Sequence, residues 1–216
     1  MICRLFKRRR RQTREGVFQV IYDRNLWGDP ESVSGPGSSL TRTSAFSAEL
    51  PPLFSELGVR TLLDAPCGDL NWLSALPLDL DEYIGVDIVS ELIAHNQRVH
   101  NAASRSFRRL DLVVDPLPRA DLILCRDGLV HLSSADVVSA MHNFKRSGSV
   151  YLLTTTFTSV ASNRDIETGG WRPINLQQPP FSFPSPLRVI DERRFDADGR
   201  PTGKSLALWR LEQLEP

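Results

Sequence analysis

The spacing of apolar and polar residues changes near Arg60. Before this point, apolar residues recur at helical spacing over 15–27 and 43–57, with a loop rich in Gly, Ser and Pro over 28–39 between them. The pair Pro51–Pro52 implies a break in the second helix or a new first turn. This part of the chain is therefore predicted to be helix and loop.

Beyond Arg60, short apolar runs alternate with amphipathic segments. Strands are predicted at 61–66, 83–87, 107–111, 121–125 and 150–156. Between them we expect a short helix after Gly68 and longer helices over 89–101 and 134–145. Apolar strands that alternate with helices indicate parallel pairing and helices on both faces of a sheet. Two further strand-like runs, 187–191 and 205–211, predict an α/β fold whose seven-stranded, mostly parallel sheet ends in an antiparallel hairpin.

A long irregular segment, residues 157–186, separates the fifth and sixth predicted strands. Loops of this length inside a compact domain usually serve as lids or binding loops. We predict a lid that contacts the substrate through Asn163, Asp165, Trp171, Arg172 and Asn175. The alternative is a structural wrap against the sheet.

Composition and charge place the chain among ordinary globular proteins. It has 216 residues, 41% of them hydrophobic and 24% charged, with a formal net charge of zero. Residues 1–14 carry seven cations and no acid, so a basic arm precedes an acidic single domain over 15–216. We expect this arm to be flexible and solvated, or to touch nucleic acid, an anionic membrane surface or another subunit. The acidic domain disfavours a long nucleic-acid groove.

The cysteines and the absence of a long apolar run narrow the class further. Cys3, Cys67 and Cys125 are odd in number and far apart, so neither a disulfide framework nor a structural zinc site is predicted. No run of apolar residues is long enough for a membrane span. The pattern excludes fibrous, disordered and integral-membrane classes, and a cytoplasmic protein is predicted.

Acidic residues stand at or just after the ends of four successive predicted strands: Asp64, Asp87, Asp111 and Asp127. Ligands of open α/β sheets bind at this edge. An acid after the second strand can accept hydrogen bonds from both ribose hydroxyls, and one after the third can accept from an exocyclic amine such as that of adenine. The turn at Cys67–Gly68 offers backbone N–H groups and close approach. Together these features predict an adenosine-type pocket.

The glycine-rich sequences that bind phosphate groups are missing. The first strand leads into D-A-P-C-G-D, with Ala65 at the first glycine position of G-x-G-x-x-G, and no Gly-Lys-Ser/Thr follows a strand. A nicotinamide dehydrogenase and a kinase are therefore disfavoured.

The motifs L-L-D-A-P-C-G-D, Y-I-G-V-D, L-D and D-L-I-L-C-R-D-G-L-V-H-L resemble those of class I S-adenosylmethionine-dependent methyltransferases. The resemblance covers residues 27–211 and implies a Rossmann-like fold. It extends to a bacterial group with an S-G-x-G-S segment, here 34–38, and an N-x-D-I-x-x-G-x-W-R-P-x-N-L stretch, here 163–176.

The resemblance implies a role for each matching residue. Asp64 and the turn Pro66, Cys67 and Gly68 would line the methionine half of the cofactor, with Arg42 and Ser38 near its carboxylate. Asp87 would hold the ribose, Ile88 would pack on adenine, and Asp111 with Leu112 would meet the adenine edge. Ala65 stands where the family motif usually has glycine. Because a methyl group is small, we expect weaker tolerance at this position rather than loss of cofactor binding.

The chemistry is predicted at the end of the fourth strand. A neutral His131 is a candidate general base for a hydroxyl or amine, although a histidine here can also serve only to bond backbone or pack against the lid. Asp127 is a candidate contact to cofactor or acceptor, and Arg126 a candidate cation that orients the acceptor. No cluster of acids with metal-ligand spacing follows this strand, so no divalent ion is predicted.

The prediction is therefore an S-adenosylmethionine-dependent methyltransferase that O-methylates a glycan or polar small molecule. This acceptor was inferred from Trp171 and Arg172, which can stack on and grip a polar ring. The alternatives are a catalytically silent domain that binds S-adenosylmethionine and a nucleic-acid methyltransferase that uses the basic arm. The sequence C-R-D-G, in place of a D/N-P-P-Y/F motif, disfavours base methylation.

Overall fold

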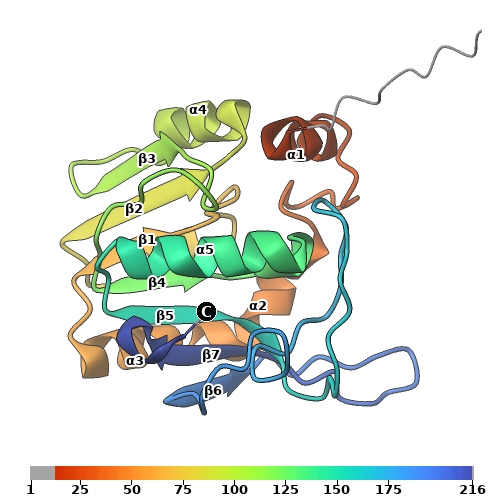
Figure 1. Ribbon diagram of the computed structural model, residues 1–216. Helices are drawn as coiled ribbons and strands as arrows, with labels where there is room; N and C mark the ends of the chain where they lie inside the picture. Colours follow the sequence, from red (N-terminus) through yellow and green to blue (C-terminus); the bar gives the residue numbers. More distant parts are fainter. Residues whose placement is uncertain (1–12, 216) are drawn as a thin grey trace, which may run out of the picture.

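The computed structural model describes residues 13–215, which form a seven-stranded sheet with the order β3-β2-β1-β4-β5-β7-β6 (Figure 1). The strands are β1 Thr61–Asp64, β2 Glu82–Asp87, β3 Arg105–Arg109, β4 Leu122–Cys125, β5 Tyr151–Phe157, β6 Arg188–Asp191 and β7 Lys204–Arg210. The first five pair in parallel, and β7 is antiparallel to both β5 and β6. The predicted fold class is confirmed.

Five α-helices accompany the sheet over the described residues: α1 Arg14–Asp23, α2 Leu40–Ser47, α3 Leu50–Leu57, α4 Ser90–Val99 and α5 Ser134–Arg146. Short 3-10 turns lie at η1 Pro36–Ser38, η2 Leu73–Ala75, η3 Leu129–His131 and η4 Leu211–Gln213. The break predicted at Pro51–Pro52 is confirmed, because the span 43–57 forms two helices and the prolines lie in the first turn of α3. Two helix predictions need correction: the first helix ends at Asp23, and the short helix after Gly68 is only η2.

The alternation of side chains along each strand builds two cores, one on each face of the sheet. In β4, Leu122 and Leu124 join the core beneath α2, α3 and α4, whereas Ile123 and Cys125 join the core beneath α5. Figure 1 shows α5 crossing one face of the sheet while α2 and α3 lie against the other. Because both faces of the sheet are covered, β4 is apolar throughout and β1 is apolar between its two end residues.

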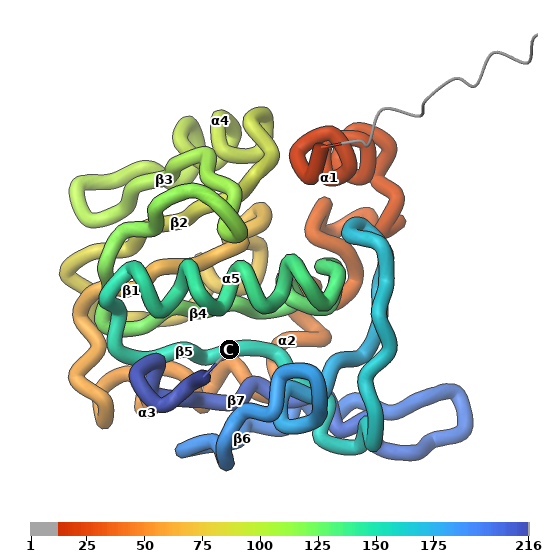
Figure 2. The backbone as a smooth tube through the Cα atoms, viewed as in Figure 1, coloured from red at the N-terminus to blue at the C-terminus, as the bar shows by residue number. Residues whose placement is uncertain are grey.

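The segment between β5 and β6, residues 158–187, contains no helix or strand. It rises beside the carboxyl edge of the sheet to α1 and then returns to β6 (Figure 2). Ile174, Leu176, Phe181 and Phe183 from this segment are buried in the core beneath α5. We call residues 158–187 the wrap.

The basic arm predicted over 1–14 falls mostly outside the described residues. Its last residue, Arg14, is the first residue of α1 and forms ion pairs with Asp111 and Asp136. Residues 1–12 lie outside the description. No helix within 13–215 is long and apolar enough to cross a membrane.

Candidate functional site

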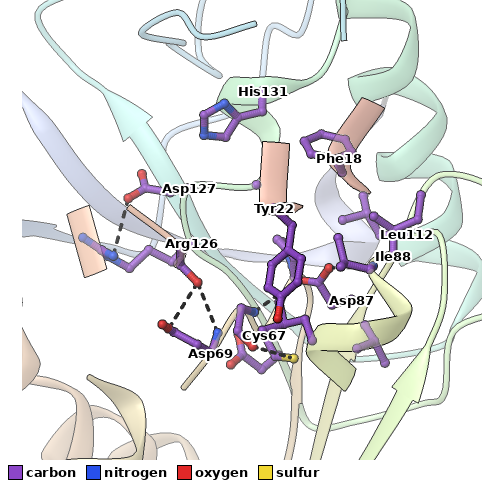
Figure 3. A pocket seen from close by; sticks show the side chains of 18 of the residues that line it. Phe18, Tyr22, Cys67, Asp69, Asp87, Ile88, Leu112, Arg126, Asp127 and His131 are labelled. Atoms are coloured by element: carbon purple, nitrogen blue, oxygen red, sulfur yellow. Dashed lines mark hydrogen bonds and ion pairs between the residues drawn. The ribbon is translucent and has the colours of Figure 1, made fainter. Parts of the chain in front are cut away.

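A cavity opens at the carboxyl ends of β1, β2 and β4 and beside the segment that follows β3, under α1 (Figure 3). It encloses about 1140 Å³, open solvent at its mouth included. Twelve of the predicted site residues line it: Ser38, Asp64, Pro66, Cys67, Gly68, Asp87, Ile88, Asp111, Leu112, Arg126, Asp127 and His131. The strand ends thus bring together residues spread over nearly half of the sequence.

The turn after β1 is packed tightly against the S-G-x-G-S segment. Gly68 has φ +54°, and a Cβ placed there would lie 2.2 Å from Ser34 Oγ, so only glycine fits. Asp69 holds the start of this segment and the residues before it, because its carboxylate accepts hydrogen bonds from Ser34 Oγ (3.2 Å), Ser32 Oγ (3.0 Å) and the Val33 amide (2.9 Å). The close approach that the sequence predicts at Gly68 is therefore made by the side chain of Ser34.

Asp87, the last residue of β2, is buried at the floor of the cavity. Its carboxylate accepts hydrogen bonds from the Gly68 amide (3.3 Å) and the Val89 amide (3.0 Å). Burial raises the pKa of this carboxyl above its usual value, although the backbone amides act in the opposite direction. The carboxylate is held by neutral donors, and no ion pair of Asp87 occurs among residues 13–215.

Asp64, at the end of β1, has a similar environment. Tyr83 donates its hydroxyl hydrogen to Asp64 Oδ2 at 2.8 Å. Burial raises the pKa of Asp64 to about 7, which the bond from Tyr83 and the charge of Arg126 oppose and the charge of Asp87 reinforces. A cationic ligand group beside Asp64 would therefore meet a carboxyl that ionises in its presence.

Asp111 is engaged by α1. Its Oδ2 accepts from Arg14 Nε at 2.8 Å, its Oδ1 accepts from the Val113 amide at 2.9 Å, and Arg14 also reaches Asp136 on α5 at 2.8 Å. Arg14 thus fastens α1 to the sheet at the point where the sequence predicted an adenine contact.

Aromatic residues near α1 form the roof of the cavity, and the sequence analysis did not assign them to the site. Figure 3 shows Phe18 and Tyr22 entering from α1 above the carboxylates, and Trp27 follows α1. The Trp27 ring lies 4.8 Å from the ring of His131. The helical periodicity of 15–27 indicated an apolar face, but nothing in that pattern said which part of the molecule it covers.

Arg126 is almost fully buried, and its guanidinium is occupied by the protein itself. Nε and Nη2 donate to the two carboxylate oxygens of Glu192 at 3.0 and 2.8 Å, and Nη2 also donates to the Gly37 carbonyl at 2.9 Å. The rings of Phe46 and Trp72 lie against the guanidinium carbon at 4.9 and 5.3 Å. The predicted acceptor-orienting cation is instead tied to the S-G-x-G-S segment.

Asp127 follows directly and has a left-handed backbone with φ +55°. Its Oδ2 accepts from Lys204 Nζ at 2.6 Å, and its Oδ1 accepts from Thr155 Oγ1 at 3.3 Å. Burial acts to raise the pKa of Asp127, but the charges of Lys204 and Arg126 hold it well below its usual range. Lys204 also lies 3.2 Å from Glu192, which completes a cluster of two cations and two acids.

His131, the last residue of η3, is half-buried at the same end of the cavity. Its Nδ1 lies 2.8 Å from the Gly170 carbonyl oxygen, which can only accept, so Nδ1 carries the hydrogen. Burial lowers the pKa of His131 below its usual value, since the opposing effects of Gly170 and Asp127 are smaller. The ring is therefore neutral near pH 7, and Nε2 keeps its lone pair.

The whole structure is similar to solved methyltransferases. A S-adenosylmethionine-dependent methyltransferase from Leishmania major matches with a TM-score of 0.65 and 16% identity over 90% of this chain and 83% of its own. One from Anabaena variabilis matches with a TM-score of 0.60 and 14% identity over 92% and 93%. Magnesium protoporphyrin IX methyltransferase from Synechocystis, crystallised with bound S-adenosylmethionine, matches with a TM-score of 0.56 and 12% identity over 92% and 97%. This chain has the methyltransferase fold.

No protein-family model and no curated protein matches the sequence. The methyltransferase fold therefore rests on the structure, where the likeness covers up to 92% of this chain. The cavity lies in this fold at the sheet edge where open α/β sheets bind their ligands.

Six predicted site residues of this methyltransferase fold do not line the cavity. Arg42 lies exposed on α2, and its carbonyl accepts from Arg194. The others are the five residues of the predicted lid: Asn163, Asp165, Trp171, Arg172 and Asn175.

The polar side chains of the wrap are used within the protein. Asn163 bonds the backbone of Asn175, the Asn175 side chain bonds the Val160 carbonyl, and Asp165 accepts from the first amide of α5 at Ser134. Arg172 is fully buried, whereas Trp171 is 54% exposed and packs edge-on against Phe157. The structural wrap, the alternative to a lid, fits these contacts.

Proposed function

We propose that this protein is an S-adenosylmethionine-dependent methyltransferase that transfers a methyl group to a hydroxyl oxygen of a sugar or another polar small molecule. One observation carries the proposal. On a methyltransferase fold, buried carboxylates at the ends of β1 and β2 face one cavity with the neutral imidazole of His131. The residues on each side of that cavity differ in chemistry, and we assign them different tasks.

The ends of β1, β2 and β3 are assigned to the cofactor. Asp87 accepts from the ribose hydroxyls, and Asp64 with the turn over 66–68 binds the methionine half. Ile88 and Leu112 pack on adenine, and Asp111 meets its edge while sharing its carboxylate with Arg14. Carboxylates held only by neutral donors suit a cofactor that carries a sulfonium and an ammonium group, because their charge is not already matched. When bound, S-adenosylmethionine supplies an electrophilic methyl group.

His131 is assigned to the acceptor. With Nδ1–H donated to Gly170, Nε2 is the free acceptor of the ring and takes the proton that the acceptor hydroxyl loses. Asp127 lines the same end and contacts the acceptor or the cofactor. Trp27, beside His131, offers an aromatic face on which an uncharged ring packs. The acceptor is thus oriented by packing and by its bond to His131.

The first experiment is calorimetric titration of the protein with S-adenosylmethionine and S-adenosylhomocysteine, with NAD as the control. We expect micromolar binding of the first two and none of NAD. Absence of binding by both adenosyl compounds would contradict the cofactor assignment of Asp64, Gly68 and Asp87.

The second experiment tests His131. Purified protein is incubated with methyl-labelled S-adenosylmethionine and a panel of monosaccharides, cyclitols and phenols. For any compound that is methylated, His131→Ala is expected to lower turnover by roughly 10²- to 10⁴-fold, the usual contribution of a general base, without changing cofactor affinity. His142→Ala, on α5 outside the cavity, is the matched control and is expected to keep full turnover. An unaltered rate in His131→Ala would contradict the base assignment.

A further inference from the structure

The wrap runs alongside the segment that carries His131 and bonds to it residue after residue. Asp165 accepts from the Ser134 amide at 2.7 Å, and Thr168 Oγ1 accepts from the Ser133 amide at 2.9 Å. The Gly169 amide donates to the His131 carbonyl at 2.8 Å. As the wrap advances along the sequence its partners go backwards, so the two segments are antiparallel. We call wrap residues 165–172 the clamp.

The clamp holds His131 at both its backbone and its ring. Gly169 binds the backbone carbonyl of His131, and the next residue, Gly170, accepts the hydrogen bond from Nδ1. Because a carbonyl oxygen cannot donate, this second bond selects the tautomer with hydrogen on Nδ1. Consecutive backbone groups of one short segment therefore set the position and the tautomer of the ring together.

Arg172 fastens the clamp to η3. Its Nη1 donates to the carbonyls of Leu129 and Val130, both at 3.1 Å, and its amide donates to Val130 at 3.1 Å. The side chain is fully buried, and no carboxylate lies within ion-pair distance of it among residues 13–215. A buried guanidinium is costly to desolvate. This one binds backbone carbonyls alone, those of Leu129 and Val130 in η3 and that of Arg164, which indicates a demand for its placement between the wrap and η3.

We propose that Arg172 and Gly170 are positioning residues of the methyl-transfer reaction, which hold His131 in the Nδ1–H tautomer with Nε2 turned to the acceptor. This inference rests on the proposed function, since it gives the clamp a purpose only if His131 acts on the acceptor. It explains why the clamp carries Asp165, Thr168 and Arg172, none of which lines the cavity. Those residues serve the acceptor indirectly, through the histidine that they hold.

The charged groups that act on the His131 ring come from three elements. Asp127, after β4, acts to raise the pKa of His131, whereas Lys204 on β7 and Arg172 in the clamp act to lower it. Substitution of Arg172 by an uncharged residue is thus expected to raise this pKa, and substitution by lysine is expected to leave it nearly unchanged. The two variants therefore separate the effect of the Arg172 side chain on the position of His131 from the effect of its charge on the pKa of His131.

The test compares Arg172→Met and Arg172→Lys with the full-length chain. Arg188→Met, which removes an exposed cation of β6 paired with Glu56, is the matched control. Long-range proton–nitrogen NMR spectra of the histidine rings, recorded over a pH series, report the tautomer and the pKa of His131 without any acceptor. We expect the Nδ1–H tautomer in the wild type and the control. In Arg172→Met we expect a mixture of tautomers and a raised pKa, and in Arg172→Lys a mixture with little change of pKa.

Turnover on an acceptor from the panel supplies a second readout. A ring displaced by about 1 Å can cost up to roughly 10²-fold in kcat, so both Arg172 variants are expected to lower kcat while the KM for S-adenosylmethionine stays unchanged. If Arg172→Met does not fold, as near-ultraviolet circular dichroism would reveal, Arg172→Lys decides the matter. An Nε2–H tautomer in the wild type, or folded variants with unchanged tautomer and kcat, would overturn the proposal.

The experiments distinguish the role of the clamp from the role of His131 and from cofactor binding. Full activity of His131→Ala would contradict both the general-base assignment and the positioning role of the clamp. If His131→Ala is inactive but the wild-type ring shows no preference for the Nδ1–H tautomer, only the positioning role of the clamp is contradicted. Absence of S-adenosylmethionine binding would overturn the proposed function and would leave the NMR result on the ring untouched.

Discussion

The two ends of the cavity use the same residue type, aspartate, in opposite environments. At the ends of β1 and β2, Asp64 and Asp87 are bound by a phenol hydroxyl and backbone amides. At the end of β4, Asp127 lies against Lys204 and Arg126. Negative charge is therefore left unmatched at the first end and neutralised at the second. The difference teaches that an acid at a strand end keeps its full charge for a cationic ligand only when its partners in the protein are neutral.

The pKa shifts follow the same division. Burial raises the pKa of Asp64 and Asp87, because neutral donors do not fully replace the lost water. Asp127 is less buried, and the adjacent cations lower its pKa although burial acts to raise it. We therefore regard the Arg126–Glu192 pair at the β4 end as framework beside the acceptor side of the cavity, and the carboxylates at the β1–β2 end as groups whose charge a bound cation can match.

The largest effect is expected from the framework end. Arg126→Met leaves buried Glu192 and the Gly37 carbonyl without their shared donor, and breaking a buried ion pair of this kind costs about 3–5 kcal/mol of unfolding free energy. Urea denaturation measures this loss. Arg188→Met removes an equally charged but exposed partner of Glu56, and a loss below about 1 kcal/mol is expected there. Equal losses in the two variants would contradict the view of Arg126 as framework.

The second effect belongs to the cofactor end. Asp87→Ala is expected to weaken S-adenosylmethionine binding by roughly 10- to 100-fold, since hydrogen bonds to a charged group contribute about 1.5–3 kcal/mol. Calorimetry provides the affinity. Asp121→Ala is the matched control, because Asp121 also accepts from backbone amides, those of Arg60 and Thr61, but outside the cavity. If both variants bind the cofactor like the wild type, the ribose assignment is wrong.

The smallest effect concerns pH. Asp64, with a pKa near 7, keeps its proton in the folded protein to higher pH than in the unfolded chain, so the unliganded protein loses stability as pH rises from about 4 to about 7. A cationic ligand favours the ionised carboxyl, and cofactor affinity is expected to increase about tenfold between pH 6 and pH 8. Titrations at several pH values check this. Asp64→Asn should remove the pH dependence; a slope that survives in this variant must come from another group.

The sheet and the order of strands and helices along the chain were predictable, because the local spacing of apolar residues indicates most of these elements. The acids at the strand ends were predictable for the same reason, since topology brings all parallel strand ends to one edge. Arg172 was not predictable in its actual role. An arginine in a loop has the same sequence appearance whether it faces a substrate or binds the carbonyls of Leu129 and Val130.

Contacts between distant segments were the other gap. Lys204 and Glu192 meet Asp127 and Arg126 only because β7 returns beside β5, and no spacing along the chain signals that pairing. The roof formed by α1 depends on Arg14 reaching Asp111, across 97 positions of sequence. The spacing of apolar residues indicates which face of a helix or strand is apolar, but it does not indicate which part of the molecule that face covers.

The antiparallel course of the clamp has a practical side for protein engineering. Long surface loops are ordinarily the first places to accept insertions, grafted peptides or randomised libraries. Here each added residue within 165–172 would shift the bonding partners of His131 by one position, and Gly169 leaves no room for a side chain against Val17. Libraries aimed at new acceptors are better built on the roof, at Tyr22 and Trp27, where side chains face the cavity and the histidine keeps its support.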